Sequence, residues 1–119
     1  MEIGCGPGVA AREICKRVES GYVLAIDRSA KAIQQALIGS KEEIASGRLE
    51  YKQVAIEYFE LEADQPLFDL VFAVRVGALD GRHPLTGIKA MEKIAQVLKP
   101  EGQLFVDGVK VAVTKSNLK

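Results

Sequence analysis

The residues with the clearest chemical meaning open the chain, where an acid precedes three glycines at alternate positions. The segment is Glu2-Ile3-Gly4-Cys5-Gly6-Pro7-Gly8, between an apolar start and the first helical pattern. Glycine is needed where a backbone turns sharply after a strand and where a ligand approaches closer than a Cβ atom permits. We therefore predict a turn that faces a cofactor. The alternative is a tight strand-to-helix turn that binds nothing.

A second acid, Asp27, follows the apolar run 22–26 and precedes a helical pattern. At the carboxyl end of a strand, a carboxylate can accept hydrogen bonds from both hydroxyl groups of a ribose. Asp27 can also stabilise the amino end of the next helix through the helix dipole, and the two roles are compatible. This position predicts a ribose-containing cofactor.

A nicotinamide cofactor is the competing interpretation, because residues 6–11 also fit the looser G-x-G-x-x-A form of the dinucleotide fingerprint. Dinucleotide sites seat a pyrophosphate on the amino end of the helix, and Glu2 would repel it. A cofactor that carries an ammonium group is tolerated beside Glu2. An NAD-binding oxidoreductase domain therefore remains an alternative.

The downstream segments follow the first one in a family-specific order. Residues 1 to about 108 resemble, segment by segment, the class I S-adenosylmethionine-dependent methyltransferase family. Residues 2–8 resemble its motif I, and residues 68–80 resemble motif IV with the loop that faces the reacting methyl group. Residues 90–104 resemble its helix, Lys-Pro-x-Gly turn and fifth strand.

This resemblance implies S-adenosylmethionine as the cofactor and methyl transfer as the activity. It also implies cofactor contacts from Glu2, Gly4, Cys5, Gly6, Pro7, Gly8, Asp27, Arg28, Ala55, Ile56, Val74 and Arg75. One position departs from the family, since Ala55 stands where an acid usually contacts the adenine amino group. The amide of Ile56 can still bond the adenine ring and its side chain can cover the ring face. A non-catalytic or fragmentary cofactor-binding subunit is therefore a second alternative.

Methyl transfer depends mainly on positioning the acceptor in line with the methyl group, and only some acceptors need a general base. His83 is the one histidine of the chain, in a loop that can border an acceptor pocket. A solvated loop residue is the favoured interpretation, because the sequence places no second group to orient the imidazole, and we assign no catalytic residue. Arg75 and Asp80 are expected near the reacting methyl group. Arg75 and Arg82 are either ligands of an acidic acceptor or surface charges.

Composition excludes several classes of function. Lysine plus arginine equal aspartate plus glutamate at 16 each, so no overall charge attracts nucleic acid or an acidic membrane. We expect one domain over residues 1–119, a cytoplasmic location and a small-molecule acceptor. Cys5 and Cys15 provide neither a disulfide framework nor, with a single histidine, a zinc site, and no metal is expected.

Apolar runs alternate with stripes of helical spacing, as in β-α units of a parallel sheet. After a short start at residues 1–3, the predicted strands are 22–26, 49–54, 68–74 and 103–106. The predicted helices have apolar stripes over 11–18, 33–37 and 88–98, with Ser29 as an amino-terminal cap and an interruption at Gly39-Ser40. The expected fold is a Rossmann-like three-layer α/β/α arrangement with a mainly parallel sheet of about five strands, truncated at both ends relative to the family.

The predicted last strand bears on assembly with other chains. Only residues 110–119 follow Val109, which is too few for the family's closing hairpin and helix. We therefore expect an exposed apolar edge at residues 104–106, extended by Val109, Val111 and Val113. Such an edge favours pairing with another chain, so we expect a homodimer or another association that covers it, or else a marginally stable fragment of a longer protein.

Overall fold

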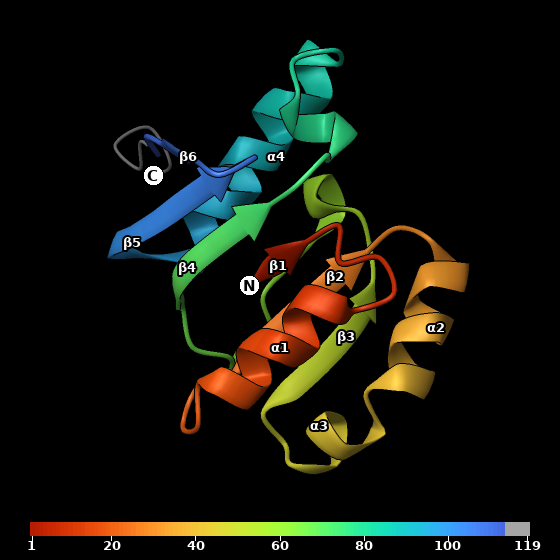
Figure 1. The fold of residues 1–119 in the computed structure, drawn as a ribbon. Helices are drawn as coiled ribbons and strands as arrows, with labels where there is room; N and C mark the ends of the chain where they lie inside the picture. The colour runs from red at the N-terminus through yellow and green to blue at the C-terminus, as the bar shows by residue number, and fades with distance from the viewer. Residues whose placement is uncertain (114–119) are drawn as a thin grey trace. The chain divides into compact units, whose positions relative to one another are not determined.

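The computed structural model describes residues 1–113, which form two compact units (Figure 1). The first unit is Met1–Ala55 and the second begins at Ile56. The elements of the first unit are β1 (Glu2–Ile3), α1 (Val9–Arg17), β2 (Val23–Asp27), α2 (Ala30–Gly39), α3 (Lys41–Ala45) and β3 (Leu49–Gln53). One domain over residues 1–119 stays a prediction.

In the first unit, β2 lies between β1 and β3, and both pairs are parallel. Val23 pairs with Leu49 and Ala25 with Tyr51, so these alternate residues point to one face of the strands. Helices α1 and α2 pack on that face (Figure 1). The buried cluster between them consists of Cys5, Ala11, Cys15, Val23, Ala25, Ile33, Ala36, Leu49 and Tyr51.

The helix ends of this unit follow local signals. The Oγ atom of Ser29 accepts a hydrogen bond from the amide of Ala32 at 3.2 Å, which confirms the predicted cap of α2. Helix α2 ends at Gly39 and α3 begins at Lys41, as the interruption predicted. Arg48 donates from Nη1 to the carbonyl oxygens of Cys15 (2.8 Å) and Val18 (2.5 Å), and so satisfies the end of α1.

The second unit contains a parallel and an antiparallel strand pair. Strand β5 lies between β4 and β6, parallel to β4 and antiparallel to β6. The elements are η1 (Ile56–Tyr58), β4 (Phe68–Ala73), η2 (Gly77–Leu79), α4 (Pro84–Val97), β5 (Leu98–Val106) and β6 (Val109–Val111). The helices flanking mainly parallel strands confirm the Rossmann-like α/β class. Among residues 1–113, no helix is both long and apolar enough to cross a membrane.

The boundary between α4 and β5 differs from the prediction. Leu98 was expected on the helix stripe, but it is the first residue of β5 and pairs with Phe68. The pairing then shifts, because the next partners are Leu70 and Gln103, and the Lys-Pro-x-Gly segment forms the irregular stretch between them. The same stripe placed Ile88 against the sheet, yet 60% of Ile88 is exposed.

The end of the described chain corrects the prediction of an exposed β5 edge. Six strands are present in residues 1–113 instead of about five, because β6 pairs with β5 over residues 104–106. Asp107 and Gly108 connect the two strands with φ of 49° and 79°. Asp-Gly with positive φ at both positions is a strong signal for a two-residue hairpin, and the sequence interpretation missed it. Residues 114–119 lie outside the described residues.

Candidate functional site

The glycine loop, residues 4–8, is bound to the carboxyl end of β2. The amides of Gly4 and Cys5 donate to the carbonyl oxygen of Ile26 at 2.8 and 3.0 Å. The amide of Gly6 donates to Oδ2 of Asp27 at 2.8 Å. All three loop glycines have positive φ, between 55° and 86°, so each one is in a conformation that other residues adopt at a cost.

The structure gives two of these glycines different roles. At Gly8, an added Cβ would overlap the Tyr51 hydroxyl and lie 3.1 Å from Cβ of Ala36, so this glycine is required by packing. At Gly6, an added Cβ would meet nothing within 4 Å. The open side of the loop is therefore at Gly6, where a ligand can approach the backbone.

Asp27 is placed as the sequence predicted, at the end of β2. Its two carboxylate oxygens each accept one backbone hydrogen bond, from Gly6 at 2.8 Å and from Ser29 at 2.9 Å. A carboxylate offers about four lone-pair sites, so both oxygens retain capacity for ribose hydroxyl groups. Arg28 follows it and is exposed. The amide of Val54 donates to the Asp27 carbonyl at 3.0 Å, which brings the segment before Ala55 to the same end of the strands.

Glu2 is an unusual carboxylate because it is buried and one of its oxygen atoms has no hydrogen-bond partner among the described residues. Only 7% of the residue is exposed, and the oxygen atom in question is Oε1. Burial raises the pKa of Glu2 to about 7; the amino terminus opposes the rise and the charge of Asp27 adds to it. A buried carboxyl group without a partner is unfavourable, and a cation beside it would relieve that cost.

Cys5 and Pro7 contribute to the loop without adding reactive chemistry. Burial raises the pKa of the Cys5 thiol to about 12, and the charges of Glu2 and Asp27 act in the same direction. The thiol therefore stays protonated and is not a nucleophile. Pro7 is exposed, and its carbonyl oxygen accepts a hydrogen bond from Arg12 at 2.9 Å. In residues 1–113, no group of three or more His, Cys, Asp or Glu side chains is arranged to hold a metal ion.

The remaining predicted site residues belong to the second unit. Ile56 begins η1, and only 2% of it is exposed. Val74 and Arg75 follow β4 and are exposed. The amide of Arg75, whose φ is 58°, donates to Oδ1 of Asp107 at 2.8 Å. The sequence interpretation missed Asp107, which ties the loop after β4 to the turn after β5.

The charged residues of the loop after β4 pair locally. Arg82 Nε lies 2.7 Å from Oδ2 of Asp80, and the Arg82 amide donates to Oδ1 at 3.0 Å. The backbone hydrogen bond from Arg82, followed by its side-chain contact and charge, lowers the pKa of Asp80. Arg82 is thus neutralised by a neighbour two residues away, which favours the surface-charge interpretation.

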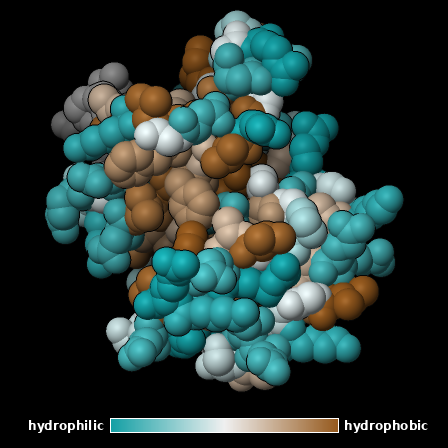
Figure 2. Space-filling model, in the orientation of Figure 1, coloured by the Kyte–Doolittle hydropathy of each residue, from teal (hydrophilic) through white to brown (hydrophobic). Residues whose placement is uncertain are grey.

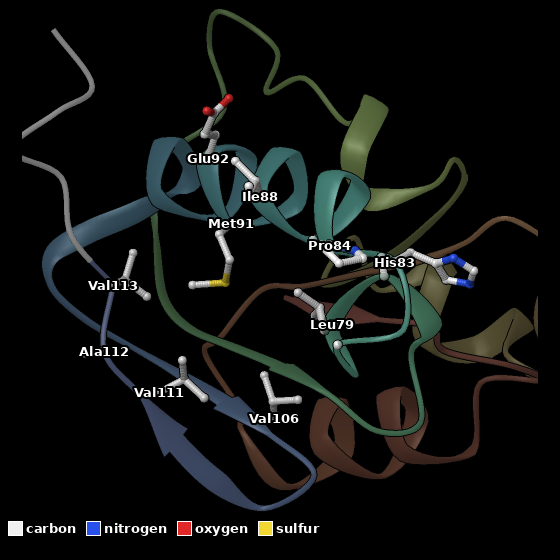
Figure 3. Close-up of a pocket in the computed structure, with 13 residues that line it drawn as sticks. Leu79, His83, Pro84, Ile88, Met91, Glu92, Val106, Val111, Ala112 and Val113 are labelled. Carbon is white, nitrogen blue, oxygen red and sulfur yellow. The ribbon is translucent and has the colours of Figure 1, made fainter.

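An apolar cavity of about 770 Å³ lies entirely within the second unit (Figure 3). Its walls come from η2, α4, the end of β5 and residues 111–113. Leu79, Met91, Val106 and Val111 face one another across it in Figure 3, whereas the His83 imidazole extends away from them. His83 therefore borders the cavity without pointing into it, and its exposed side chain fits the favoured interpretation of a solvated loop residue. Apolar side chains also gather over β4 and β5 on the face seen in Figure 2.

Residues 1–102 match a protein-family model described as "Methyltransferase domain". No curated protein sequence is a significant match to the chain.

Solved structures share the fold. The N-methyltransferase NodS from Bradyrhizobium japonicum WM9 is 23% identical, with a TM-score of 0.70 over 87% of this chain and 54% of its own. The (4+2)-cyclase SpnF is 27% identical, with a TM-score of 0.69 over 88% of this chain and 36% of its own. The plantazolicin methyltransferase BpumL, solved with a pentazolic desmethylPZN analog and SAH, is 23% identical, with a TM-score of 0.69 and the same coverage of 88% and 36%. The chain thus spans 36 to 54% of the length of these proteins.

Proposed function

The chain belongs to the methyltransferase domain family, and from this premise we propose that it binds S-adenosylmethionine and transfers the methyl group to a small-molecule acceptor. The observation that carries the proposal is the unpaired, buried Oε1 of Glu2 beside the glycine loop. The ammonium group of the cofactor is a cation with which this oxygen atom, without a hydrogen-bond partner among the described residues, can pair. The pyrophosphate of a dinucleotide would instead face an acid.

Two further features fit the same cofactor. The open side of Gly6 lets a ligand lie against the loop backbone, and Asp27 has lone pairs left for the ribose hydroxyl groups. Arg28, Ala55, Ile56, Val74 and Arg75 remain proposed contacts. The bound cofactor would supply an electrophilic methyl group on a sulfonium. The chain's part is to hold the cofactor and exclude water, since in-line positioning provides most of the rate.

The cavity in the second unit favours a small, largely apolar acceptor. Its volume of about 770 Å³ lies in the range of small-molecule sites, and ligands of open α/β folds bind beyond the carboxyl ends of the strands. Leu79 and Val106 stand at or beyond the ends of β4 and β5. We propose this cavity for the apolar part of the acceptor. A cytoplasmic location and the lack of a nucleic-acid partner stay predictions from composition.

Calorimetry with S-adenosylmethionine, its product S-adenosylhomocysteine (SAH) and NADH tests the cofactor. We expect both sulfur compounds to bind and NADH to give no heat. Tight NADH binding without a response to the other two would reject the proposal and favour the oxidoreductase alternative.

A cofactor-binding role without methyl transfer is the second candidate. Ala55 in place of the usual acid favours it, and SpnF, which shares the fold, is a cyclase. Incubation with S-adenosylmethionine and a panel of apolar alcohols, phenols and amines separates the two candidates. Formation of SAH that depends on one of these compounds supports methyl transfer. Binding without any turnover supports the second candidate.

A further inference from the structure

Three side chains packed against the glycine loop form a hydrogen-bonded row, and none of them was among the predicted site residues. Arg12 comes from α1, Ser40 from the junction between α2 and α3, and Tyr51 from β3. Ser40 is fully buried and only 8% of Tyr51 is exposed. Buried hydroxyl groups need partners inside the protein, so the contacts of this row are specific.

The row reaches the loop at two carbonyl groups. Nη1 of Arg12 donates to the carbonyl oxygen of Pro7 at 2.9 Å and to Oγ of Ser40 at 3.1 Å. The hydroxyl oxygens of Ser40 and Tyr51 are 2.8 Å apart. The Tyr51 hydroxyl donates to the carbonyl oxygen of Gly8 at 3.4 Å. Two adjacent loop carbonyls are therefore held on one side of the loop.

When all the hydrogen bonds of the row form, each hydroxyl group can donate its proton in one direction only. An arginine has only donors, so Ser40 accepts from Arg12. Tyr51 gives its single proton to Gly8, so it accepts the proton of Ser40. Burial raises the pKa of Tyr51 above its usual value, against the opposing effects of the Ser40 hydrogen bond and the Arg12 charge. The phenol is therefore protonated at neutral pH and able to donate.

We propose that Arg12, Ser40 and Tyr51 are positioning residues for the glycine loop in cofactor binding, a role that rests on the function proposed above. The end of β2 binds the loop through Ile26 and Asp27, and the row binds it through the carbonyls of residues 7 and 8. The loop is thus fixed from two sides while Gly6 stays open. A loop ordered before binding loses less conformational entropy when the ligand arrives.

The first test compares Tyr51→Phe with the matched control Tyr22→Phe. Tyr22 precedes β2, at the strand end opposite Asp27, and its hydroxyl donates to Glu50 at 2.6 Å. Loss of one buried hydrogen bond predicts about three- to tenfold weaker SAH binding for Tyr51→Phe. The control should bind as the wild type does. In the ligand-free chain, the amide of Gly8 should exchange hydrogen faster in Tyr51→Phe only.

A double-mutant cycle with Ser40→Ala tests whether the residues act as a row. If they do, the effects of Tyr51→Phe and Ser40→Ala on SAH affinity are less than additive, because both substitutions remove the hydrogen bond between Ser40 and Tyr51. Circular dichroism identifies any variant that fails to fold, and Tyr51→Phe keeps the ring in place. Failure of the wild type to bind SAH rejects the proposed function, whereas amide exchange in the free chain tests the positioning role alone. Unchanged affinity and exchange in Tyr51→Phe, or additive effects in the cycle, overturn the inference.

Discussion

Glu2 and Asp27 are carboxylates on neighbouring parallel strands, but their surroundings give them different properties. Asp27 accepts two backbone hydrogen bonds and is half-buried. Glu2 is buried, and its Oε1 atom receives none from the described residues. The ionised form of Glu2 is consequently costly in the free protein and useful only when a cation is bound.

The raised pKa of Glu2 makes the stability of the ligand-free chain depend on pH. The folded-state pKa of about 7 exceeds the usual 4.5, so the folded state binds the extra proton between these values. The contribution of Glu2 to stability is fully present below pH 4.5 and is lost as the pH rises through 7. Glu2→Gln should therefore stabilise the chain increasingly, by up to about 3 kcal/mol, as the pH rises from 5 to 8. Urea unfolding of both chains at each pH measures the difference.

If the free energies of unfolding of Glu2→Gln and wild type differ by the same amount at pH 5 and pH 8, burial does not raise the pKa of Glu2 in this way. The same variant should bind SAH more weakly at pH 8, because the amide cannot pair with the ammonium group as a charge does. A more stable chain with weaker binding is thus the expected combination.

Asp27→Asn tests the ribose contact. The amide keeps the size of the side chain and one carbonyl oxygen, but its nitrogen only donates, so it accepts a hydrogen bond from neither a backbone amide nor a hydroxyl group. We expect SAH binding to weaken by about 1–3 kcal/mol. Calorimetry measures the change, with Asp69→Asn, an exposed residue of β4, as the control. Equal affinities for wild type and Asp27→Asn would remove Asp27 from the site.

At the scale of elements, the turn from β1 to α1 combines two requirements in one glycine-rich segment. Gly8 has no room for a Cβ atom because Tyr51 and Ala36 pack against it, whereas Gly6 faces open space. The first requirement belongs to the fold and the second to the ligand. Glycines in the same motif, two residues apart, therefore respond differently to substitution.

Gly8→Ala and Gly6→Ala form a matched pair for this difference. Both add strain at a positive φ, of about 1 kcal/mol, but only the Cβ at residue 8 overlaps another side chain. Gly8→Ala should lower the thermal midpoint clearly more than Gly6→Ala.

Gly6→Val should retain helical circular dichroism and lose SAH binding, because its side chain fills the open side of the loop. Normal binding by Gly6→Val would show that the ligand does not approach there.

At the scale of the whole molecule, a homodimer remains a proposal. The strand proposed to pair between the two chains is now β6 instead of β5. Within residues 1–113, β6 is the last strand beside β5, and 65% of Val109 is exposed. Edge strands with apolar residues favour pairing with another chain, and an added charge opposes it. Light scattering after size exclusion should give a dimer mass that falls on dilution and in Val109→Lys. The control Val9→Lys, at an equally exposed valine of α1 (64%), should remain dimeric. A monomer at every concentration would end the proposal.

The sequence by itself determined the features that depend on neighbouring residues. Alternating apolar runs and helical stripes predicted β2, β3, β4, α1 and α2, because strand and helix periods are local properties. The acid, the alternate glycines and Asp27 identified the loop and the strand end that the proposed function uses. Asp107-Gly108 was equally local and predicted a hairpin, but its turn signal was overlooked.

Only the tertiary structure decided which of these residues lack partners and which support the site. Among the described residues, the buried Oε1 atom of Glu2 has no hydrogen-bond partner. The contact of Gly8 with Tyr51 and the Arg12–Ser40–Tyr51 row join residues up to 43 positions apart. Arg12, Ser40 and Tyr51 carry no motif, because an arginine, a serine and a tyrosine acquire their roles from packing. Contacts between distant residues depend on how strands and helices pack, and no local pattern encodes that packing.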